Sequence, residues 1–209
     1  PPRSGGPARQ LVILLHGWGA DGNDVIGLAP YWGELLPDAA FVSPHAPFPC
    51  DMGFGRQWFS LADRTPEVIM AEVRLVAPMI DAFIDDQLAA HGLSAPQLAV
   101  VGFSQGTMMA LYVVPRRPDE IAALVGYSGR LIGAGELERE TKSRPPVRLI
   151  HGEHDEMVPA SSMDSAAEAL AAAGFSVETH LRPGLGHGID PEGIAIAGRF
   201  IAEQFAKRG

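Results

Sequence analysis

An apolar run that stops at a Gly-x-Ser-x-Gly pattern and continues as a helix-like pattern constrains the fold of this chain most strongly. The run covers residues 98–103, the serine is Ser104, and the helix-like pattern covers residues 107–113. Glycines two positions before and after the serine leave room for a sharp turn from a strand into a helix. The serine hydroxyl would then project from the end of a sheet beside a helix N-terminus, where backbone N–H groups stabilise negative charge. An ordinary glycine-rich turn is the alternative, and the flanking patterns favour the strand-turn-helix interpretation.

Strand-like and helix-like segments alternate along the chain. The most regular helical stripe lies within residues 66–90, with Thr65 as its expected cap and Gly92 as its expected end. Further helices are expected at residues 161–173 and 191–207, and strands at residues 11–15, 39–42, 98–103, 121–127, 147–151 and 175–181. This alternation predicts an α/β fold: one mainly parallel sheet with helices on both faces.

Length and charge narrow the class of protein further. A chain of 209 residues suits one domain with a sizeable core, and residues 1–10, rich in Pro and Gly, predict a flexible N-terminal tail. No apolar run reaches the roughly 18 residues that span a bilayer, and no secretion signal opens the chain. A formal charge of −9 without a Lys or Arg cluster argues against nucleic acid and anionic membrane surfaces as partners, and we expect no stable membrane insertion. The single cysteine, Cys50, excludes an internal disulfide and suits a reducing compartment, so we expect a cytoplasmic protein.

A serine hydroxyl needs a base to become a nucleophile, and the glycine-flanked His187 is the best candidate. It follows the strand expected at residues 175–181, and parallel sheets gather their functional loops at the carboxyl ends of the strands. A flexible loop with an incidental histidine is the alternative. Other histidines fit less well, because they lie inside a predicted strand, before the serine or at the end of the long helix: His180, His45, His16 and His91.

The base in turn needs a carboxylate to orient it, and the loop after the strand at residues 147–151 is rich in acids. We expect Asp155, rather than Glu153 or Glu156, to hold the histidine. A metal site and a charged, solvent-exposed loop are the two alternatives for this stretch. The first lacks the i, i+4 histidine pair typical of helical zinc sites.

The chain order Ser104, Asp155, His187 is that of the α/β-hydrolase arrangement, and it differs from the orders in chymotrypsin-like and subtilisin-like proteases. By this hypothesis His187 takes the proton of Ser104 as the serine attacks an acyl carbon. Asp155 holds the useful tautomer, and water later hydrolyses the acyl-enzyme.

The developing oxyanion needs two hydrogen-bond donors. The backbone N–H of Gln105, directly after the nucleophile, is one candidate, and the backbone N–H of Trp18 is the other. Trp18 lies in the glycine-rich loop of residues 16–24. That loop can equally be a tight turn into a helix capped by Asn23 or Asp24, and both interpretations can hold together.

An aromatic stretch at residues 44–61 is the candidate acyl pocket. Phe54, Trp58 and Phe59 are the expected substrate-binding residues, and packing over the core is the alternative. Met108 and Met109 could extend the pocket wall or belong to the helix core.

Several motifs together resemble the phospholipase/carboxylesterase family, which includes the acyl-protein thioesterases and small bacterial carboxylesterases. The matching motifs lie at residues 15–22, 43–47, 56–59, 102–106, 151–155 and 186–187. The resemblance runs from Leu11 to Phe205. It implies a single α/β-hydrolase domain over residues 11–209, without a large cap domain, which acts on carboxylic esters or thioesters with no cofactor and no metal.

The resemblance also supports Ser104, Asp155 and His187 as the triad, with Trp18 and Gln105 as backbone donors. The chain departs from the thioesterases at Trp18, where those members commonly have leucine, and its loop is one residue longer before Asp21. This departure leans toward the bacterial carboxylesterases and away from protein depalmitoylation.

We therefore expect a serine carboxylesterase for short- to medium-chain acyl esters. A lysophospholipase or acyl-thioesterase on the same triad is the first alternative. The second is a non-catalytic ligand-binding protein of the same fold, which would not need the triad. The partner is a small-molecule acyl ester or thioester, and the sequence leaves homodimerisation open.

Overall fold

Six strands form one parallel sheet, as the alternating pattern predicts. The computed structural model describes residues 1–208. The strand order is β2-β1-β5-β6-β7-β8, and every neighbouring pair is parallel. The loops after β5, β7 and β8 therefore emerge at the same edge of the sheet. The bounds are β1 Gln10–Leu15, β2 Ala39–Val42, β5 Leu98–Phe103, β6 Ala123–Tyr127, β7 Val147–Gly152 and β8 Val177–Arg182.

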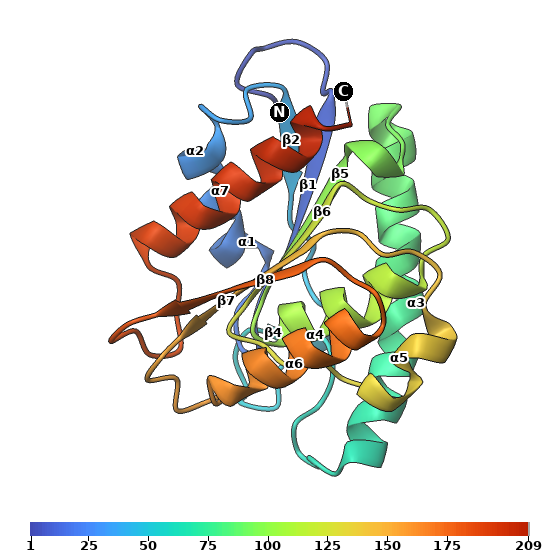
Figure 1. The fold of residues 1–209 in the computed structure, drawn as a ribbon, viewed down its shortest axis with the longest axis vertical. Helices are drawn as coiled ribbons and strands as arrows, with labels where there is room; N and C mark the ends of the chain where they lie inside the picture. Colours follow the sequence, from blue (N-terminus) through green and yellow to red (C-terminus); the bar gives the residue numbers. More distant parts are fainter. Residues whose placement is uncertain (209) are drawn as a thin grey trace.

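Helices cover both faces, because the central strands are apolar on both sides. In Figure 1, α3, α4, α5 and α6 lie on one side of the sheet and α1, α2 and α7 on the other. Each side has its own buried apolar cluster, to which alternate residues of β5 contribute. The bounds are α1 Gly22–Val25, α2 Ala29–Trp32, α3 Pro66–His91, α4 Gln105–Val113, α5 Ala134–Glu140, α6 Ser161–Ala172 and α7 Pro191–Ala206. No helix within residues 1–208 is both long and apolar enough to cross a membrane.

The long helix α3 matches its predicted limits closely. Gly92 ends it in the left-handed region at φ 65°, where glycine is favoured. Thr65 occupies the N-cap position, but its side chain makes no capping hydrogen bond. The predicted apolar stripe is buried except for the half-buried Phe83: Ile69, Val73, Val76, Ile80 and Ile84.

Two strands of the sheet begin later than expected, while its other strand limits agree with expectation to within one residue. β6 begins two residues later than predicted, and so does β8. Phe175, the expected first residue of the latter strand, instead closes α6 by donating its N–H to Leu170 O at 3.0 Å.

The first ten residues lie against the loop before β2. Ser4 N donates to Pro37 O and Arg9 N to Asp38 O, both at 2.9 Å. β1 begins at Gln10, one residue inside the segment predicted as a tail.

Candidate active site

Ser104 sits on a strained turn between β5 and α4. Its backbone has φ 53° and ψ −116°, a conformation that L-residues other than glycine rarely adopt. Two backbone bonds hold the turn: Ser104 N donates to Tyr127 O at 2.8 Å, and Met108 N donates to Ser104 O at 3.1 Å. The surrounding backbone therefore imposes this conformation on the serine.

The two flanking glycines are required by close packing. A Cβ on Gly102 would come within 3.0 Å of the Thr107 backbone, and one on Gly106 within 3.0 Å of the Leu15 carbonyl. Real Cβ atoms essentially never make such contacts. The turn is thus in close backbone contact with β1 and with α4, the helix that follows it.

Gly106→Ala should therefore lower the free energy of unfolding by about 3 kcal/mol, since the clash is with backbone that cannot rotate away. Urea unfolding measures the change. Gly135→Ala is the matched control, because its Cβ would meet nothing within 4 Å in α5. There alanine should stabilise by about 0.5–1 kcal/mol. Equal effects of the two substitutions would contradict the close packing of the turn.

Ser104, His187 and Asp155 meet at the carboxyl edge of the sheet. His187 Nε2 lies 3.0 Å from Ser104 Oγ, and His187 Nδ1 lies 2.8 Å from Asp155 Oδ2. Both distances are hydrogen-bonding distances. Since the carboxylate can only accept, Nδ1 carries the proton and Nε2 accepts from the serine hydroxyl.

The Asp155 carboxylate is buried and surrounded by donors. Its Oδ1 accepts from Met157 N at 2.9 Å and from Val158 N at 2.8 Å, and His151 Nε2 lies 3.2 Å from Oδ2. Burial by itself would raise the pKa of Asp155, but the hydrogen bonds from Val158 and His187 lower it below its usual value. The carboxylate is therefore charged at neutral pH. The other two acids of this loop, Glu153 and Glu156, are exposed.

The loops that carry Asp155 and His187 are packed directly on each other. His154 N donates to Leu185 O at 2.8 Å, and Glu153 N donates to Arg182 O at 3.0 Å. A Cβ on Gly152 would come within 3.0 Å of the carbonyls of Leu185 and Gly186. This contact, which motif spacing alone does not reveal, sets the distance between the acid and the base.

Asp190 closes the His187 loop at its far end. It is the N-cap of α7, where it accepts from Gly193 N at 2.8 Å, and it pairs with Arg182 at 2.9 Å. The hydrogen bond from Arg182, supported by the one from Gly193, lowers the pKa of Asp190. Both ends of the loop are thereby tied together.

Asp190→Ala should lower the free energy of unfolding at pH 7 by about 1–2 kcal/mol through the lost cap. Because the pKa is lower in the folded state, this contribution is present above the ordinary carboxyl pKa of about 4 and lost as the pH falls through the lowered pKa. Urea unfolding at pH 7, 5 and 3 should show the difference from the wild type shrinking with acid. A difference that grows toward pH 3 would refute the assigned charge. Glu192→Gln, on an exposed pair in the same helix, should change little.

The loop after β1 is held by a buried, neutral histidine. His16 Nε2 accepts from Ala46 N at 2.9 Å, so the proton is on Nδ1, which donates to Gly17 O at 2.8 Å. Burial lowers the pKa of His16, in keeping with this uncharged form. The short hairpin of β3 Phe48–Pro49 and β4 Arg56–Gln57 also supports the loop, since Gly19 N donates to Arg56 O at 2.9 Å.

Trp18, from this loop, and Gln105, the first residue of α4, line the same cavity as Ser104. A helix leaves its first N–H groups without intrahelical partners, so the N–H of Gln105 is available there. The expectation that Asn23 or Asp24 caps α1 is wrong. The N-cap is Asp21, which accepts from Asn23 N at 2.7 Å, because Asp21 directly precedes the first helical residue.

The predicted aromatic pocket residues do not line this cavity. Trp58 and Phe59 are 2% and 0% exposed and belong to the apolar core, while Phe54 is 63% exposed. Trp58 Nε1 donates to His16 O at 2.9 Å, and the Gln105 side chain bridges Trp58 N and Phe59 O. These two aromatics therefore support the loops around Ser104 from inside. Packing, the alternative for this stretch, is the correct interpretation for both.

The cavity that contains Ser104 measures about 230 Å³. Its apolar wall comes from loops and helices far apart in the sequence: Leu61, Met108, Met157, Val158 and Pro159. Of the two methionines that could extend the wall or belong to the helix core, Met108 lines the cavity, whereas Met109 is fully buried in the core. No local pattern marked Leu61 or Met157, because a single apolar residue in a polar loop carries no periodicity.

A metal site was the other alternative for the loop of Asp155. Within residues 1–208, no three His, Cys, Asp or Glu side chains gather as such a site requires. His151 instead contacts the Val158 carbonyl at 2.9 Å and the Asp155 carboxylate.

Comparison with known proteins places this geometry among ester hydrolases. Residues 3–205 match the profile of the phospholipase/carboxylesterase family. The chain is 30% identical to esterase YpfH of Escherichia coli K12, over 91% of this chain and 81% of the relative. It is 26% identical to acyl-protein thioesterase 1 of Gibberella zeae, over 92% of this chain and 89% of the relative. The crystal structure of esterase PE8 superimposes with a TM-score of 0.92 at 39% identity, covering 97% of this chain and 96% of that one.

Proposed function

Because the chain belongs to the phospholipase/carboxylesterase family and is a carboxylic ester hydrolase, we propose that Ser104, His187 and Asp155 are its catalytic triad. The observation that carries the proposal is the continuous line of contacts, 3.0 Å from hydroxyl to imidazole and 2.8 Å from imidazole to carboxylate. A partly buried imidazole between an alcohol and a charged carboxylate is the arrangement that activates a serine.

In the first step the Ser104 hydroxyl transfers its proton to His187 Nε2 while Oγ attacks the ester carbonyl carbon. The imidazolium that forms is stabilised by the Asp155 carboxylate, which stays ionised. His187 then gives the proton to the leaving alkoxide as the acyl-enzyme forms. Water attacks the acyl-enzyme, again with His187 as base, and releases the carboxylic acid and free Ser104.

The oxyanion of each tetrahedral intermediate is bound by the backbone N–H groups of Trp18 and Gln105. Support comes from their place on the wall of the Ser104 cavity and from the partner-free position of the first N–H of α4. Each such donor contributes about 3 kcal/mol to transition-state stabilisation.

The substrate is an ester of a short- to medium-chain acid. A cavity of about 230 Å³ is small beside the roughly 300–1,000 Å³ of pockets for drug-sized ligands. Its apolar wall suits a hydrocarbon chain of limited length. The similarity to an acyl-protein thioesterase favours thioesters as a second substrate class for the same triad.

Two measurements test the proposal. A fluorophosphonate probe should form a covalent adduct on Ser104, located by peptide mass spectrometry, and an adduct on any other serine would contradict the triad. The second measurement is kcat/KM over p-nitrophenyl esters from acetate to palmitate, with acyl-coenzyme A thioesters of the same chain lengths. It should peak among the shorter oxygen esters, and preferential turnover of palmitoyl substrates would overturn the assigned chain length.

A further inference from the structure

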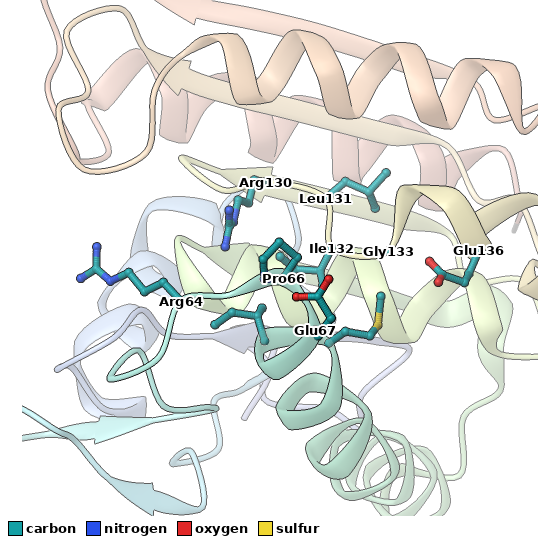
Figure 2. Close-up of a pocket in the computed structure, with 10 residues that line it drawn as sticks. Arg64, Pro66, Glu67, Arg130, Leu131, Ile132, Gly133 and Glu136 are labelled. Carbon is teal, nitrogen blue, oxygen red and sulfur yellow. The ribbon is translucent and has the colours of Figure 1, made fainter.

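Two arginines stand where the Ser104 cavity adjoins a second, larger pocket. Arg64 precedes α3, and Arg130 follows β6. Both line the cavity of about 230 Å³ that contains Ser104, and both also line a neighbouring pocket of about 390 Å³. Figure 2 shows the two arginines toward one end of this larger pocket, with Glu136 at the other end.

Both guanidinium groups are free of carboxylate partners. Within residues 1–208, neither lies within 4.0 Å of an Asp or Glu oxygen, although Glu67 and Glu136 line the larger pocket. The one side-chain hydrogen bond of Arg64 is long, from Nε to Leu61 O at 3.3 Å. By contrast, Arg117 pairs with two aspartates and Arg182 with one. In a chain of net charge −9, two unpaired cations beside the nucleophile stand out.

The position of the pair relative to Ser104 suggests what it binds. Apolar side chains, Leu61 and Met108 among them, line the Ser104 cavity together with the two arginines. A substrate held at Ser104 would therefore lay its hydrocarbon part on the apolar wall and present its end to the guanidinium groups. These planar forks match the oxygens of a carboxylate or a phosphate.

We propose that Arg64 and Arg130 select esters that carry an anionic group beyond the scissile bond. The inference rests on the proposed catalytic role of Ser104 and deepens it by assigning a substrate class. The anionic group of the substrate is either a carboxylate at the far end of the acyl chain or a phosphate on the alcohol, and both present negatively charged oxygens to the guanidinium groups.

The test compares kcat/KM for matched charged and neutral esters. Monomethyl adipate against methyl hexanoate reports a carboxylate on the acyl side. A hexanoyl ester of glycerol 3-phosphate against monohexanoylglycerol reports a phosphate on the alcohol side. The enzymes compared are the wild type, Arg64→Gln, Arg130→Gln and the double variant. Hydrolysis is followed by titrating the released carboxylic acid with base at constant pH.

We expect each single substitution to lower the charged-to-neutral ratio of kcat/KM about tenfold for one of the pairs, and the double variant to lower it further. The loss should appear mainly in KM, and the preference of the wild type should weaken with added salt. Arg9→Gln is the matched control, because Arg9 is also exposed and lines a different pocket. The pair with the larger loss identifies the source of the anion.

An unchanged ratio for both pairs in the double variant would overturn the inference, as would an equal loss in Arg9→Gln. Such a result would leave hydrolysis of the neutral esters by Ser104 intact. Absence of Ser104-dependent hydrolysis of all four esters would instead reject the proposed function, and the inference with it. Circular dichroism of each variant separates a binding defect from a folding defect.

Discussion

Ser104→Ala should lower kcat for ester hydrolysis by about 10⁶-fold while leaving the fold intact. Without Oγ no acyl-enzyme can form, and His187 Nε2 loses the group that lies 3.0 Å from it. Alanine can occupy the turn, because the backbone bonds to Tyr127 O and from Met108 N do not involve the side chain. Serine and alanine both carry a Cβ, so the backbone strain at φ 53° is the same in the variant as in the wild type. Burst-phase and steady-state kinetics on a p-nitrophenyl ester, with thermal unfolding alongside, measure both parts of the prediction.

Ser128→Ala provides the matched control. Ser128 is also a buried serine at positive φ, 46°, at the end of the next strand. In the described part of the chain its hydroxyl makes no hydrogen bond. Its removal should therefore leave hydrolysis near the wild-type rate. Strong residual activity in Ser104→Ala, or an equal loss in Ser128→Ala, would rule out Ser104 as the nucleophile.

Asp155→Asn should lower kcat by about 10⁴-fold, the second largest effect that we expect. In the variant the amide oxygen still accepts from Met157 N and Val158 N, as Oδ1 does now at 2.9 and 2.8 Å. The amide nitrogen then faces His187 Nδ1 and donates to it, so the ring proton moves to Nε2. In that tautomer the imidazole cannot take the proton of Ser104.

The measurement is kcat together with the rate of fluorophosphonate labelling, and both should fall in parallel. Glu156→Gln is the control in the same loop, where the side chain is exposed and should have little influence. The amide nitrogen also faces His151, so unfolding in urea is recorded for each variant. A labelling rate at the wild-type level in folded Asp155→Asn would show that the carboxylate does not set the tautomer.

Much of the fold follows from local pattern. The limits of α3 are readable from its apolar stripe and Gly92, and those of β5 from a six-residue apolar run ahead of the glycines. The spacing of the glycines around Ser104 likewise anticipates a turn whose tightness the structure displays. These features involve residues near one another in the chain, where periodicity and backbone preference act directly.

The aromatic stretch shows where such reasoning fails. A run rich in Trp and Phe between Gly and Pro is compatible with a pocket wall and with core packing alike. Trp58 and Phe59 belong to the buried apolar core, and Gln105, 46 residues or more further along the chain, hydrogen-bonds their backbone. The cavity wall instead contains Leu61 and Met157, single residues without a pattern around them.

The positions of the six strands of the sheet and of α3, α4, α6 and α7, the turn at Ser104 and the candidates Asp155 and His187 were thus predictable from the sequence, because each is signalled by its immediate neighbours. The separation of acid and base was not. It depends on a glycine, Gly152, that lets two loops from different strands touch, and on Asp190 and Arg182 closing the second loop. The shape of the cavity and the free charges of Arg64 and Arg130 likewise arise from packing among distant segments. Distances of this kind are properties of the whole folded chain, which no local preference encodes.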